Sequence, residues 1–480
     1  MTNYFDAYAL SESILKAIRL LGYEKTTKVQ QEVLPLLLKG QDVVVKSQTG
    51  SGKTAAFAIP ICEKISWEEN KPQAIVLTPT RELALQVKED FFNIGRFKRM
   101  KVVGLYGKAP FHIQQKELKQ KTHVVVATPG RLLDHLNKGT MITSQVRYLV
   151  IDEADEMLKM GFLEEVEEII KRLPNKRTTM LFSATLPPGI KELCKCHMKA
   201  PVEVSINPEQ ITNTKIETVC YEVTEDEKLE ALKNLTKVEN PSCCMIFCNR
   251  KERVDEVYEA LYRSHYSCAK LHGGMEQKDR FQIMEDFRRG CYRYLVATDV
   301  ASRGIDIDHI THVINFDVPE DKENYVHRIG RTGRGGRVGK ALMLIAPRDT
   351  RFIAAIESYV GYRLNRAVLP TIEQVEKAQL TFEETMHKPL ERQAKKGERL
   401  NQNILKLHIN AGKKTKMRPV DIVGTLCNLP GMSAEDIGII NIKDVSTYVE
   451  ILNGKGEMVY KRLQKTPIKG RMRRVSRVEG

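Results

Sequence analysis

The chain has 480 residues, of which 42% are hydrophobic and 29% are charged, and its formal net charge is +15. This length suggests about three domains, and the composition excludes a largely disordered chain. Residues 1–20 lack a long apolar core, and no stretch approaches 18 uncharged apolar residues, so we expect neither a secretory signal nor a membrane-spanning helix. The basic excess favours a polyanionic partner, either nucleic acid or an anionic membrane surface. The ten cysteines show no zinc-site spacing, so we expect reduced thiols.

The first part of the chain alternates short apolar runs with longer helical segments. Buried strands are predicted at residues 42–46, 74–77, 102–105, 124–127, 148–151 and 179–182. Runs such as Val124-Val125-Val126 are β-branched on both faces, which is typical of a parallel sheet covered by helices on both sides. Such sheets bind ligands at the carboxyl ends of their strands, so the loops after these strands are candidate sites.

A glycine-rich loop follows the first predicted strand and precedes a predicted helix. It consists of Ser47, Gln48, Thr49, Gly50, Ser51, Gly52, Lys53 and Thr54. Glycines let backbone N–H groups turn toward phosphate oxygens, and the helix N-terminus adds a favourable dipole. Lys53 could then reach the β- and γ-phosphates, and the Thr54 hydroxyl could bind Mg²⁺. Taken alone, the loop could also be a purely structural turn.

An acidic segment follows the fifth predicted strand. Asp152 stands where it could hold Mg²⁺, and Glu153 stands where it could orient and deprotonate an attacking water. An isolated acidic loop is usually a solvated turn. Combined with the phosphate loop, the segment predicts a site for hydrolysis of a nucleoside triphosphate.

A second α/β pattern begins near residue 216. Its predicted strands are residues 245–248, 269–272, 294–297, 312–315 and 339–345. We expect a hinge at residues 204–214, which contain Asn207-Pro208 and several polar side chains. Residues 370–400 are rich in Glu, Lys and Gln with weak helical spacing, and this predicts a charged, partly helical connector.

The end of the chain shows a third pattern. Strands are predicted at residues 404–410, 437–443, 447–452 and 471–478, and helices at 419–429 and 457–464. The order βαββαβ is that of a ferredoxin-like domain. Residues 401–480 contain 15 Lys/Arg and 7 Asp/Glu, so this sixth of the chain carries +8, about half of the net charge.

Taken in order, these motifs resemble the DEAD-box family of ATP-dependent RNA helicases, whose name motif is Asp152-Glu153-Ala154-Asp155 here. The resemblance covers roughly residues 1–365. It implies an α/β protein with two tandem RecA-like parallel-sheet domains followed by a small RRM-like βαββαβ domain. The expected boundaries are 1–206 for the ATP-binding domain, 207–368 for the second RecA-like domain, 369–403 for a charged linker and 404–480 for the RRM-like domain.

The resemblance also implies ATP and Mg²⁺ as cofactors and assigns residues to them. The adenine and ribose would contact Phe5, Tyr23, Gln30 and Asp306, in addition to the phosphate loop. Catalysis would use Lys53, Asp152 and Glu153 from the first domain, with Arg331 and Arg334 from the second as arginine fingers. The residues implied to couple ATP chemistry to RNA strand separation are Ser183, Ala184, Thr185 and His327.

RNA contacts are implied in all three domains. In the RecA-like domains they are Pro79, Thr80, Arg81, Thr128, Pro129, Gly130, Arg131, Gln277, Arg280, Thr298, Arg303 and Gly304. The family binds mainly phosphates and ribose hydroxyls, so little sequence dependence is expected there. In the third domain we expect a basic edge to contact phosphates through Lys413, Lys414, Lys416 and Arg418. Tyr448, the aromatic residue of the predicted third strand, is a further expected RNA contact. Base stacking on this sheet is poorly supported, because the first predicted strand offers no Phe, Tyr or Trp.

The whole chain is similar to the DbpA subgroup of bacterial DEAD-box proteins, as in Ala411-Gly412-Lys413-Lys414 and Tyr448-Val449-Glu450-Ile451. The similarity implies a monomeric, cytoplasmic enzyme directed to a hairpin of large-subunit (23S) ribosomal RNA during assembly of the large (50S) ribosomal subunit. A general cold-shock or mRNA-decay helicase without such targeting is the alternative. A non-catalytic RNA clamp is disfavoured by the intact Glu153, Arg331 and Arg334, and a DNA helicase by the RNA-type motif set.

Overall fold

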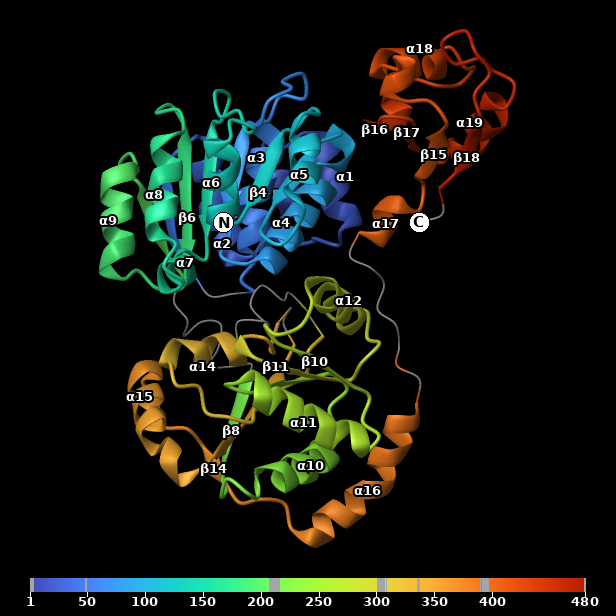
Figure 1. Cartoon of the computed structure of the whole chain (residues 1–480). Coiled ribbons are helices and arrows are strands. Elements are labelled where there is room, and N and C mark those ends of the chain that lie inside the picture. The colour runs from blue at the N-terminus through green and yellow to red at the C-terminus, as the bar shows by residue number, and fades with distance from the viewer. Residues whose placement is uncertain are drawn as a thin grey trace.

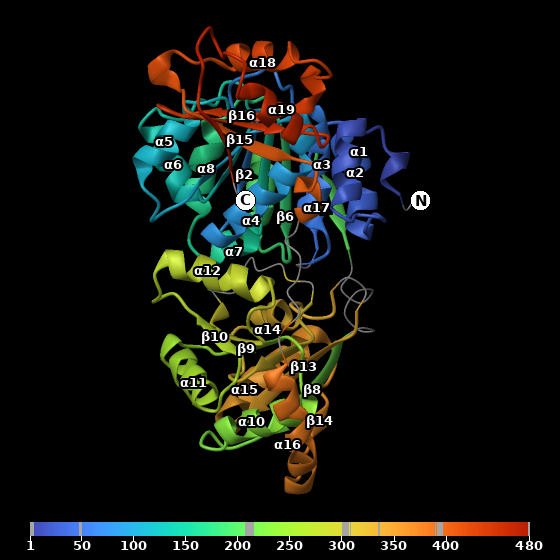
Figure 2. The same ribbon diagram turned by 90° about the vertical axis from the view of Figure 1, so that its right-hand side faces the viewer.

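The computed structural model describes residues 4–47, 50–206, 216–299, 307, 309–334, 337–388, 390 and 397–478, with Arg399 described without its side chain. The described residues form three sheets. Two α/β domains are stacked one above the other, and a small third domain lies beside the first (Figures 1 and 2).

The first sheet is parallel throughout, in the order β3-β4-β2-β5-β6-β1-β7. Its strands are β1 Val43–Lys46, β2 Ala74–Leu77, β3 Val102–Leu105, β4 Val124–Ala127, β5 Tyr148–Asp152, β6 Thr178–Ser183 and β7 Val202–Ser205. Side chains alternate between two hydrophobic cores, since Val43 and Val45 enter one and Val44 the other. The sheet is therefore buried on both faces, as its β-branched runs predict.

Helices cover both faces of this sheet (Figures 1 and 2). Their bounds are η1 Phe5–Ala7, α1 Glu12–Leu20, α2 Lys28–Leu38, α3 Lys53–Lys64, α4 Arg81–Ile94, η2 Arg96–Lys98, α5 Phe111–Leu118, α6 Pro129–Asn137, α7 Ala154–Lys159, α8 Leu163–Lys171 and α9 Pro188–His197. Helices α3, α4, α6 and α7 each begin directly after a strand or its loop. Their N-termini therefore lie at the carboxyl edge of the sheet, where ligands of such folds bind.

The second sheet repeats this arrangement in the order β10-β11-β9-β12-β13-β8-β14, again parallel. Its strands are β8 Ile216–Glu222, β9 Cys244–Phe247, β10 Cys268–Leu271, β11 Tyr294–Ala297, β12 His312–Asn315, β13 Gly339–Ile345 and β14 Arg366–Ala367. The surrounding helices are α10 Lys228–Glu239, α11 Lys251–Arg263, α12 Gln277–Arg288, α14 Lys322–Ile329, η4 Pro347–Asp349, α15 Thr350–Val360 and α16 Ile372–His387. Helix α16 lies in the segment that the sequence favours as a connector, and its buried Phe382 packs into the core of this second domain.

The third domain is an antiparallel sheet in the order β16-β17-β15-β18. A short helix, α17 Glu398–Asn401, precedes this domain and packs against α1 of the first domain. The domain's own elements are β15 Leu405–Ile409, η5 Lys413–Thr415, α18 Pro419–Cys427, η6 Ala434–Asp436, β16 Ile437–Ile442, β17 Thr447–Ile451, α19 Gly456–Leu463 and β18 Val475–Arg477. Alternate residues Leu407 and Ile409 of β15 join the core with α18 and α19, while Lys406 and His408 take the opposite, open face.

The predicted fold class is confirmed: two parallel α/β sheets precede a small βαββαβ domain. Each predicted strand has a counterpart, and β7, β8 and β14 were not predicted as strands. These three lie at or beside one edge of each sheet, where exposed residues weaken the apolar pattern. The expected hinge begins in β7, and its residues 207–214 lie outside the described part of the chain. No helix among the described residues is long and apolar enough to cross a membrane.

Candidate active site between the two α/β domains

The start of α2 holds the predicted adenine-binding glutamine. Thr27 caps the helix: its backbone N–H donates to Gln30 Oε1 at 2.9 Å, and its side chain accepts from the Gln30 N–H. Gln30 Nε2 donates to the Gly52 carbonyl at 3.1 Å, which ties α2 to the phosphate loop. A side-chain amide has two donor hydrogens and two acceptor lone pairs, so Gln30 can still offer one of each to a base edge. Phe5 and Tyr23 stack nearby, with ring centroids 6.5 Å apart.

The phosphate loop lies between β1 and α3, as predicted from its glycines. Gly50 and Gly52 both have positive φ, at 79° and 89°. Lys53 is buried at the first position of α3, where its Nζ donates to the Ser47 carbonyl at 3.2 Å, and Thr54 follows it. The Ser51 and Ser47 hydroxyl oxygens lie 3.4 Å apart. Gln48 and Thr49 lie outside the described residues.

Replacing Gly52 with alanine is expected to weaken ATP binding at least about tenfold, because left-handed backbone costs other residues roughly 1–2 kcal/mol and a clash adds to that. An added Cβ would lie 2.7 Å from Gln30 Nε2 and 2.9 Å from Thr27 Oγ1. Fluorescent-nucleotide titration would measure the loss. Gly189→Ala on α9 is the matched control, since its Cβ would make only ordinary contacts of 3.5 Å or more. Equal nucleotide affinity in both variants would contradict the expectation.

Asp152 and Glu153 end β5 and begin α7, and both carboxylates are buried. Glu153 has φ of 54°, a left-handed conformation that non-glycine residues rarely adopt and that is often found at functional sites. Burial raises the pKa of Asp152, and Lys53 opposes that shift. Burial and the adjacent Asp152 raise the pKa of Glu153, while Lys53 and Arg331 lower it. Glu153 Oε2 has no hydrogen-bond partner among the described residues, so a water or ligand atom could occupy that position.

Asp155 links this acidic turn to the end of β6. Its Oδ2 accepts from the Thr185 backbone N–H at 2.9 Å and from the Thr185 hydroxyl at 3.1 Å. The Ser183 hydroxyl accepts from the Asp155 N–H at 3.2 Å and donates to the Thr185 carbonyl at 2.6 Å. The predicted coupling segment is therefore bonded directly to the acidic motif, so a shift of either would move the other. Asp155 itself was not among the predicted site residues.

Side chains of the second domain complete the site. Arg331 and His327 of the α14 region line one pocket together with Lys53, Glu153 and Ala184. His327 Nδ1 lies 3.6 Å from Glu156 Oε1 across the domain boundary.

The second predicted arginine finger lies over the phosphate loop. Arg334 Nε donates to the Gly330 carbonyl at 2.9 Å. The same atom lies 3.0 Å from the position that a Cβ on Gly50 would occupy. Lys53, Glu153 and Arg331 thus line one pocket, Asp152 precedes Glu153 at the end of β5, and Arg334 lies over the phosphate loop.

Arg328 is a buried residue of this region that sequence reasoning did not single out. Its guanidinium binds Asp299 through two nitrogens, at 2.6 and 2.7 Å, and also donates to Asn249, Asn315 and the Asp317 carbonyl. All five N–H donors of the guanidinium therefore have acceptors. Arg328 ties α14, which carries His327, to the end of β11. The signal in the sequence was the arginine cluster after residue 326, which does not reveal which arginine is buried.

The predicted RNA loops of the two α/β domains meet each other. Thr80 caps α4 by accepting from the Leu83 N–H. Arg81 Nη1 donates to Gln277 Oε1 at 3.0 Å, and Glu82 accepts from Gln277 Nε2 at 2.9 Å and from Arg280 Nη2 at 2.7 Å.

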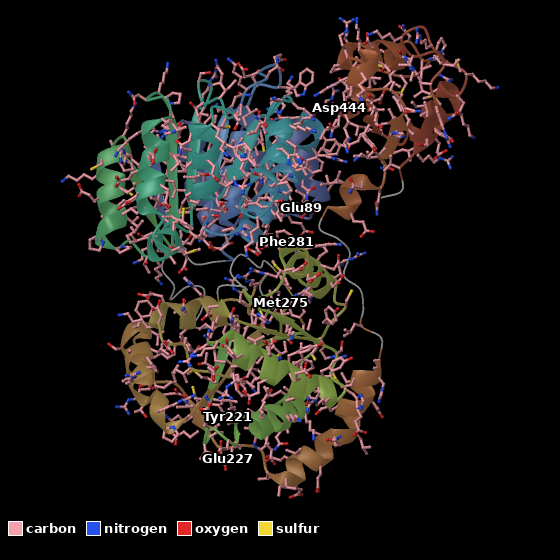
Figure 3. All side chains as sticks on the ribbon, in the orientation of Figure 1. Glu89, Tyr221, Glu227, Met275, Phe281 and Asp444 are labelled. Atoms are coloured by element: carbon pink, nitrogen blue, oxygen red, sulfur yellow. The ribbon has the colours of Figure 1, made fainter. Side chains whose placement is uncertain are left out.

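An aromatic contact supports the same boundary. Figure 3 labels Phe281 on α12 where that helix faces the first domain, and its ring lies 6.4 Å from that of Tyr106. Arg81, Gln277 and Arg280 therefore already have protein partners in this conformation.

The other predicted RNA residues of these domains are more scattered. Pro79 precedes Thr80, which caps α4. Thr128 is the N-cap of α6 and Pro129 is its first residue. The next residue, Gly130, has open space where a Cβ would lie. Arg131 donates to the Ala109 carbonyl and to Gln114, both at 2.9 Å. Thr298 follows β11, and its N–H donates to the Leu271 carbonyl. Arg303, Gly304 and Asp306 lie outside the described residues.

In the third domain, Tyr448 lies on the open face of the sheet. Its register partner is His408, and the two ring centroids are 5.1 Å apart. This pair offers a stacking surface that the sequence did not suggest, because the strand register that joins the two rings could not be predicted. Lys413 and Lys414 lie in η5, and Lys416 follows it in the left-handed region. Arg418 pairs with Asp421 at 3.3 Å.

Comparison with known proteins agrees with this geometry. Residues 27–193 match the DEAD/DEAH box helicase family, residues 227–336 match the helicase conserved C-terminal domain, and residues 406–477 match the DbpA RNA binding domain. The ATP-dependent RNA helicase DbpA of Bacillus subtilis strain 168 is 52% identical over 475 residues, which is 99% of each chain. The DEAD-box ATP-dependent RNA helicase CshA of Bacillus licheniformis is 44% identical over 374 residues, which is 78% of this chain and 77% of that relative.

Solved structures agree as well. Dbp5 of S. cerevisiae bound to RNA and ADP BeF3 is 29% identical with a TM-score of 0.72, over 80% of this chain and all of that one. Mss116p bound to ssRNA and AMP-PNP is 26% identical with a TM-score of 0.70, over 80% of this chain and 82% of that one. The chain belongs to the DEAD-box ATP-dependent RNA helicases and is of the DbpA type. It therefore uses ATP and binds RNA.

Proposed function

We propose that this helicase hydrolyses ATP at the boundary of its two α/β domains and uses the reaction to separate short RNA duplexes locally. The pocket that Arg331 shares with Lys53 and Glu153 carries the proposal, because it brings an arginine of the second domain to the acidic site of the first. Lys53 would bind the β- and γ-phosphates, and Glu153 would accept a proton from the attacking water. Arg331 and Arg334 would stabilise charge on the transferred phosphoryl group. Gln30, with Phe5 and Tyr23, would select adenine.

Mg²⁺ is the metal that fits this donor set. The Thr54 hydroxyl and the Asp152 carboxylate are hard oxygen ligands, and burial raises the pKa of Asp152 and Glu153, so a cation beside them would favour their charged forms. When bound, the ion would neutralise phosphate charge. The protein residues would supply position: Lys53 at the helix start, and Asp152 at the end of β5.

Coupling to RNA would run through domain closure. The site is split between two domains, so hydrolysis depends on their approach, and the RNA loops of both domains meet at the same boundary. ATP and RNA would then favour the same closed state and strengthen each other's binding by linkage. Asp155, bonded to Ser183 and Thr185, would be the connection between the acidic motif and the end of β6.

The proposed target is structured RNA of the large ribosomal subunit, addressed by the third domain during assembly of that subunit. The match to the DbpA RNA binding domain and the basic composition of residues 401–480 support this target. The similarity to CshA covers 78% of this chain, which is less than the similarity to DbpA covers. CshA therefore gives less support for a general helicase role than DbpA gives for the proposed target. We further propose that the enzyme acts as a monomer in the cytoplasm, where ribosomal precursors lie.

The test is RNA-stimulated ATP turnover by the whole chain and by a chain ending at Gln402, which retains Asn401 and its hydrogen bond to Arg96. Each is titrated with unrelated RNA and with a large-subunit rRNA fragment that contains the peptidyl-transferase region. The fragment is expected to stimulate the whole chain at an at least about tenfold lower concentration, a small part of the discrimination that specific nucleic-acid binding can reach. Truncation should remove this preference. Equal stimulation by both RNAs would favour a general cold-shock or mRNA-decay role.

A further inference from the structure

The third domain is attached to the first by polar contacts at one end of α4. Arg96 lies 3.2 Å from Glu450 and donates to Asn401 at 3.0 Å, and the Arg96 side chain is buried. Lys16 donates to Asn453 at 3.3 Å, and Arg99 donates to the Ala434 carbonyl. Figure 1 shows the third domain beside the first, and in Figure 2 it lies on the side of the first domain that faces the viewer. Glu450 lies between Val449 and Ile451 of the domain core, so it belongs to the open face of the sheet, and the first domain covers part of that face.

A groove of about 640 Å³ lies at this seam and is strongly basic. The first domain contributes Lys88, Lys101, Lys116, Lys119 and Lys121, and the third contributes Lys413 and Lys443. Against these seven lysines, Glu117 and Asp444 are the carboxylates among the described residues that line it. Figure 3 places Asp444 at the edge of the third domain that faces the first.

Like charges are brought close together across this seam. Burial lowers the pKa of Lys101, and Lys413 from the other domain and Lys121 lower it further. Lys413 is held in place by its backbone, whose N–H donates to the Lys443 carbonyl at 2.9 Å, and Gly412 beside it leaves no room for a side chain. Cations that lie close together in a partly desolvated groove repel one another, and an anion bound among them would offset that repulsion by attracting each of them.

Two lysines of the groove each lie against an aromatic ring. Lys121 Nζ is 3.7 Å from the centroid of Trp67, which is 43% exposed. Lys443 Nζ is 5.0 Å from the centroid of Tyr448, whose neighbour on the open face is His408. Lysines interleaved with accessible rings are typical of surfaces that bind single-stranded RNA, with phosphates on the cations and bases stacked on the rings.

We propose that this seam is a second RNA-binding track, which takes the phosphate backbone of an unpaired RNA segment between the first domain and the third. The track is separate from the loops that meet at the boundary of the two α/β domains, and it leads toward them. Lys88 lies seven residues after Arg81 on α4, which is two helical turns or about 10 Å along the same face. RNA held by the third domain could thus pass directly to the motor. The inference rests on the proposed function in taking RNA as the polyanion.

The experiment uses the whole chain and removes charge from each side of the seam separately. One variant carries Lys101→Gln and Lys121→Gln, a second carries Lys413→Gln and Lys443→Gln, and the control carries Lys191→Gln and Lys195→Gln on the exposed face of α9. Binding of a fluorescent rRNA fragment is measured by anisotropy at several salt concentrations. Each of the two seam variants is expected to bind RNA about tenfold more weakly than the unaltered chain. The slope of log K against log salt should become shallower by about 0.7 for each phosphate that the variant no longer neutralises. The control should bind as the unaltered chain does.

Trp67 gives an independent signal, because it is the one tryptophan of the sequence. RNA is expected to quench its fluorescence in the unaltered chain and much less in the Lys101/Lys121 variant. If that variant binds RNA with unchanged affinity and salt slope, or if the control loses as much affinity as the seam pairs, the track is refuted. ATP turnover at saturating RNA separates this result from a defect of the motor. It should stay unchanged in the seam variants, because these substitutions change RNA affinity and leave the ATP site intact. A loss of turnover together with normal RNA affinity would refute the track.

Discussion

Replacing Glu153 with glutamine is expected to lower RNA-stimulated ATP turnover about 10²–10⁴-fold, the usual contribution of a positioned general base. Glutamine has nearly the same shape but cannot accept the proton from the attacking water. Because Glu153 Oε2 lacks a partner among the described residues, the substitution breaks no hydrogen bond of that atom to the described part of the protein. ATP and RNA affinity should therefore be retained or increased, since the closed state would no longer be released by hydrolysis. Steady-state turnover and nucleotide titration measure the two effects.

The pH dependence of turnover gives a second check on Glu153. Its pKa is raised by burial and by Asp152, and the reaction needs the deprotonated carboxylate. Turnover by the unaltered enzyme should therefore fall as the pH is lowered through a value above the ordinary glutamate range, and the residual rate of Glu153→Gln should stay flat there. Glu164→Gln, on the exposed first turn of α8, is the matched control. A Glu153→Gln enzyme that keeps a rate within a few-fold of normal would exclude the general-base role.

Replacing Arg331 with alanine is expected to lower turnover about 10³–10⁵-fold, the range found for arginine fingers. The side chain is buried, lines the same pocket as Lys53 and Glu153, and acts electrostatically on Glu153. Its charge would be used mainly in the transition state, so ATP affinity should change much less than the rate. Single-turnover hydrolysis with saturating RNA measures the chemical step directly.

Two comparisons distinguish this role from a general loss of positive charge. Arg331→Lys keeps the charge but loses the planar fork that binds phosphate oxygens, so it should recover only part of the rate. Arg263→Ala removes an exposed arginine of the same domain and should leave turnover unchanged. If Arg331→Ala weakened ATP binding as strongly as it slowed hydrolysis, the residue would bind the ground state instead.

Most of the fold could be predicted from sequence because its signals are local. Apolar β-branched runs mark the central strands, and glycines mark the phosphate loop between β1 and α3. The edge strands were missed because β7 and β14 expose much of their length, which leaves no apolar pattern to detect.

The parts of the site that escaped prediction depend on contacts between distant segments. Arg328 gains its importance from Asp299, and His408 from its register with Tyr448, and neither relation leaves a local pattern. The lysines of the seam are likewise ordinary surface residues until the third domain is placed against the first. Asp155 was visible in the acidic motif, but its bonds to the end of β6 were not.

The bonds among Arg81, Glu82, Gln277 and Arg280 limit the free energy that RNA can gain at the boundary of the two α/β domains. In this arrangement the first domain already bonds two of the proposed RNA ligands on the second domain, Gln277 and Arg280. An incoming strand would therefore exchange partners with these side chains instead of adding new ones, and the free energy it gains there is only the difference between the two sets of bonds. A small gain at this boundary adds little to the selectivity of closure, because a ligand shifts a conformational equilibrium only by its differential affinity for the two states. Discrimination among RNAs would then fall mainly to surfaces outside this boundary.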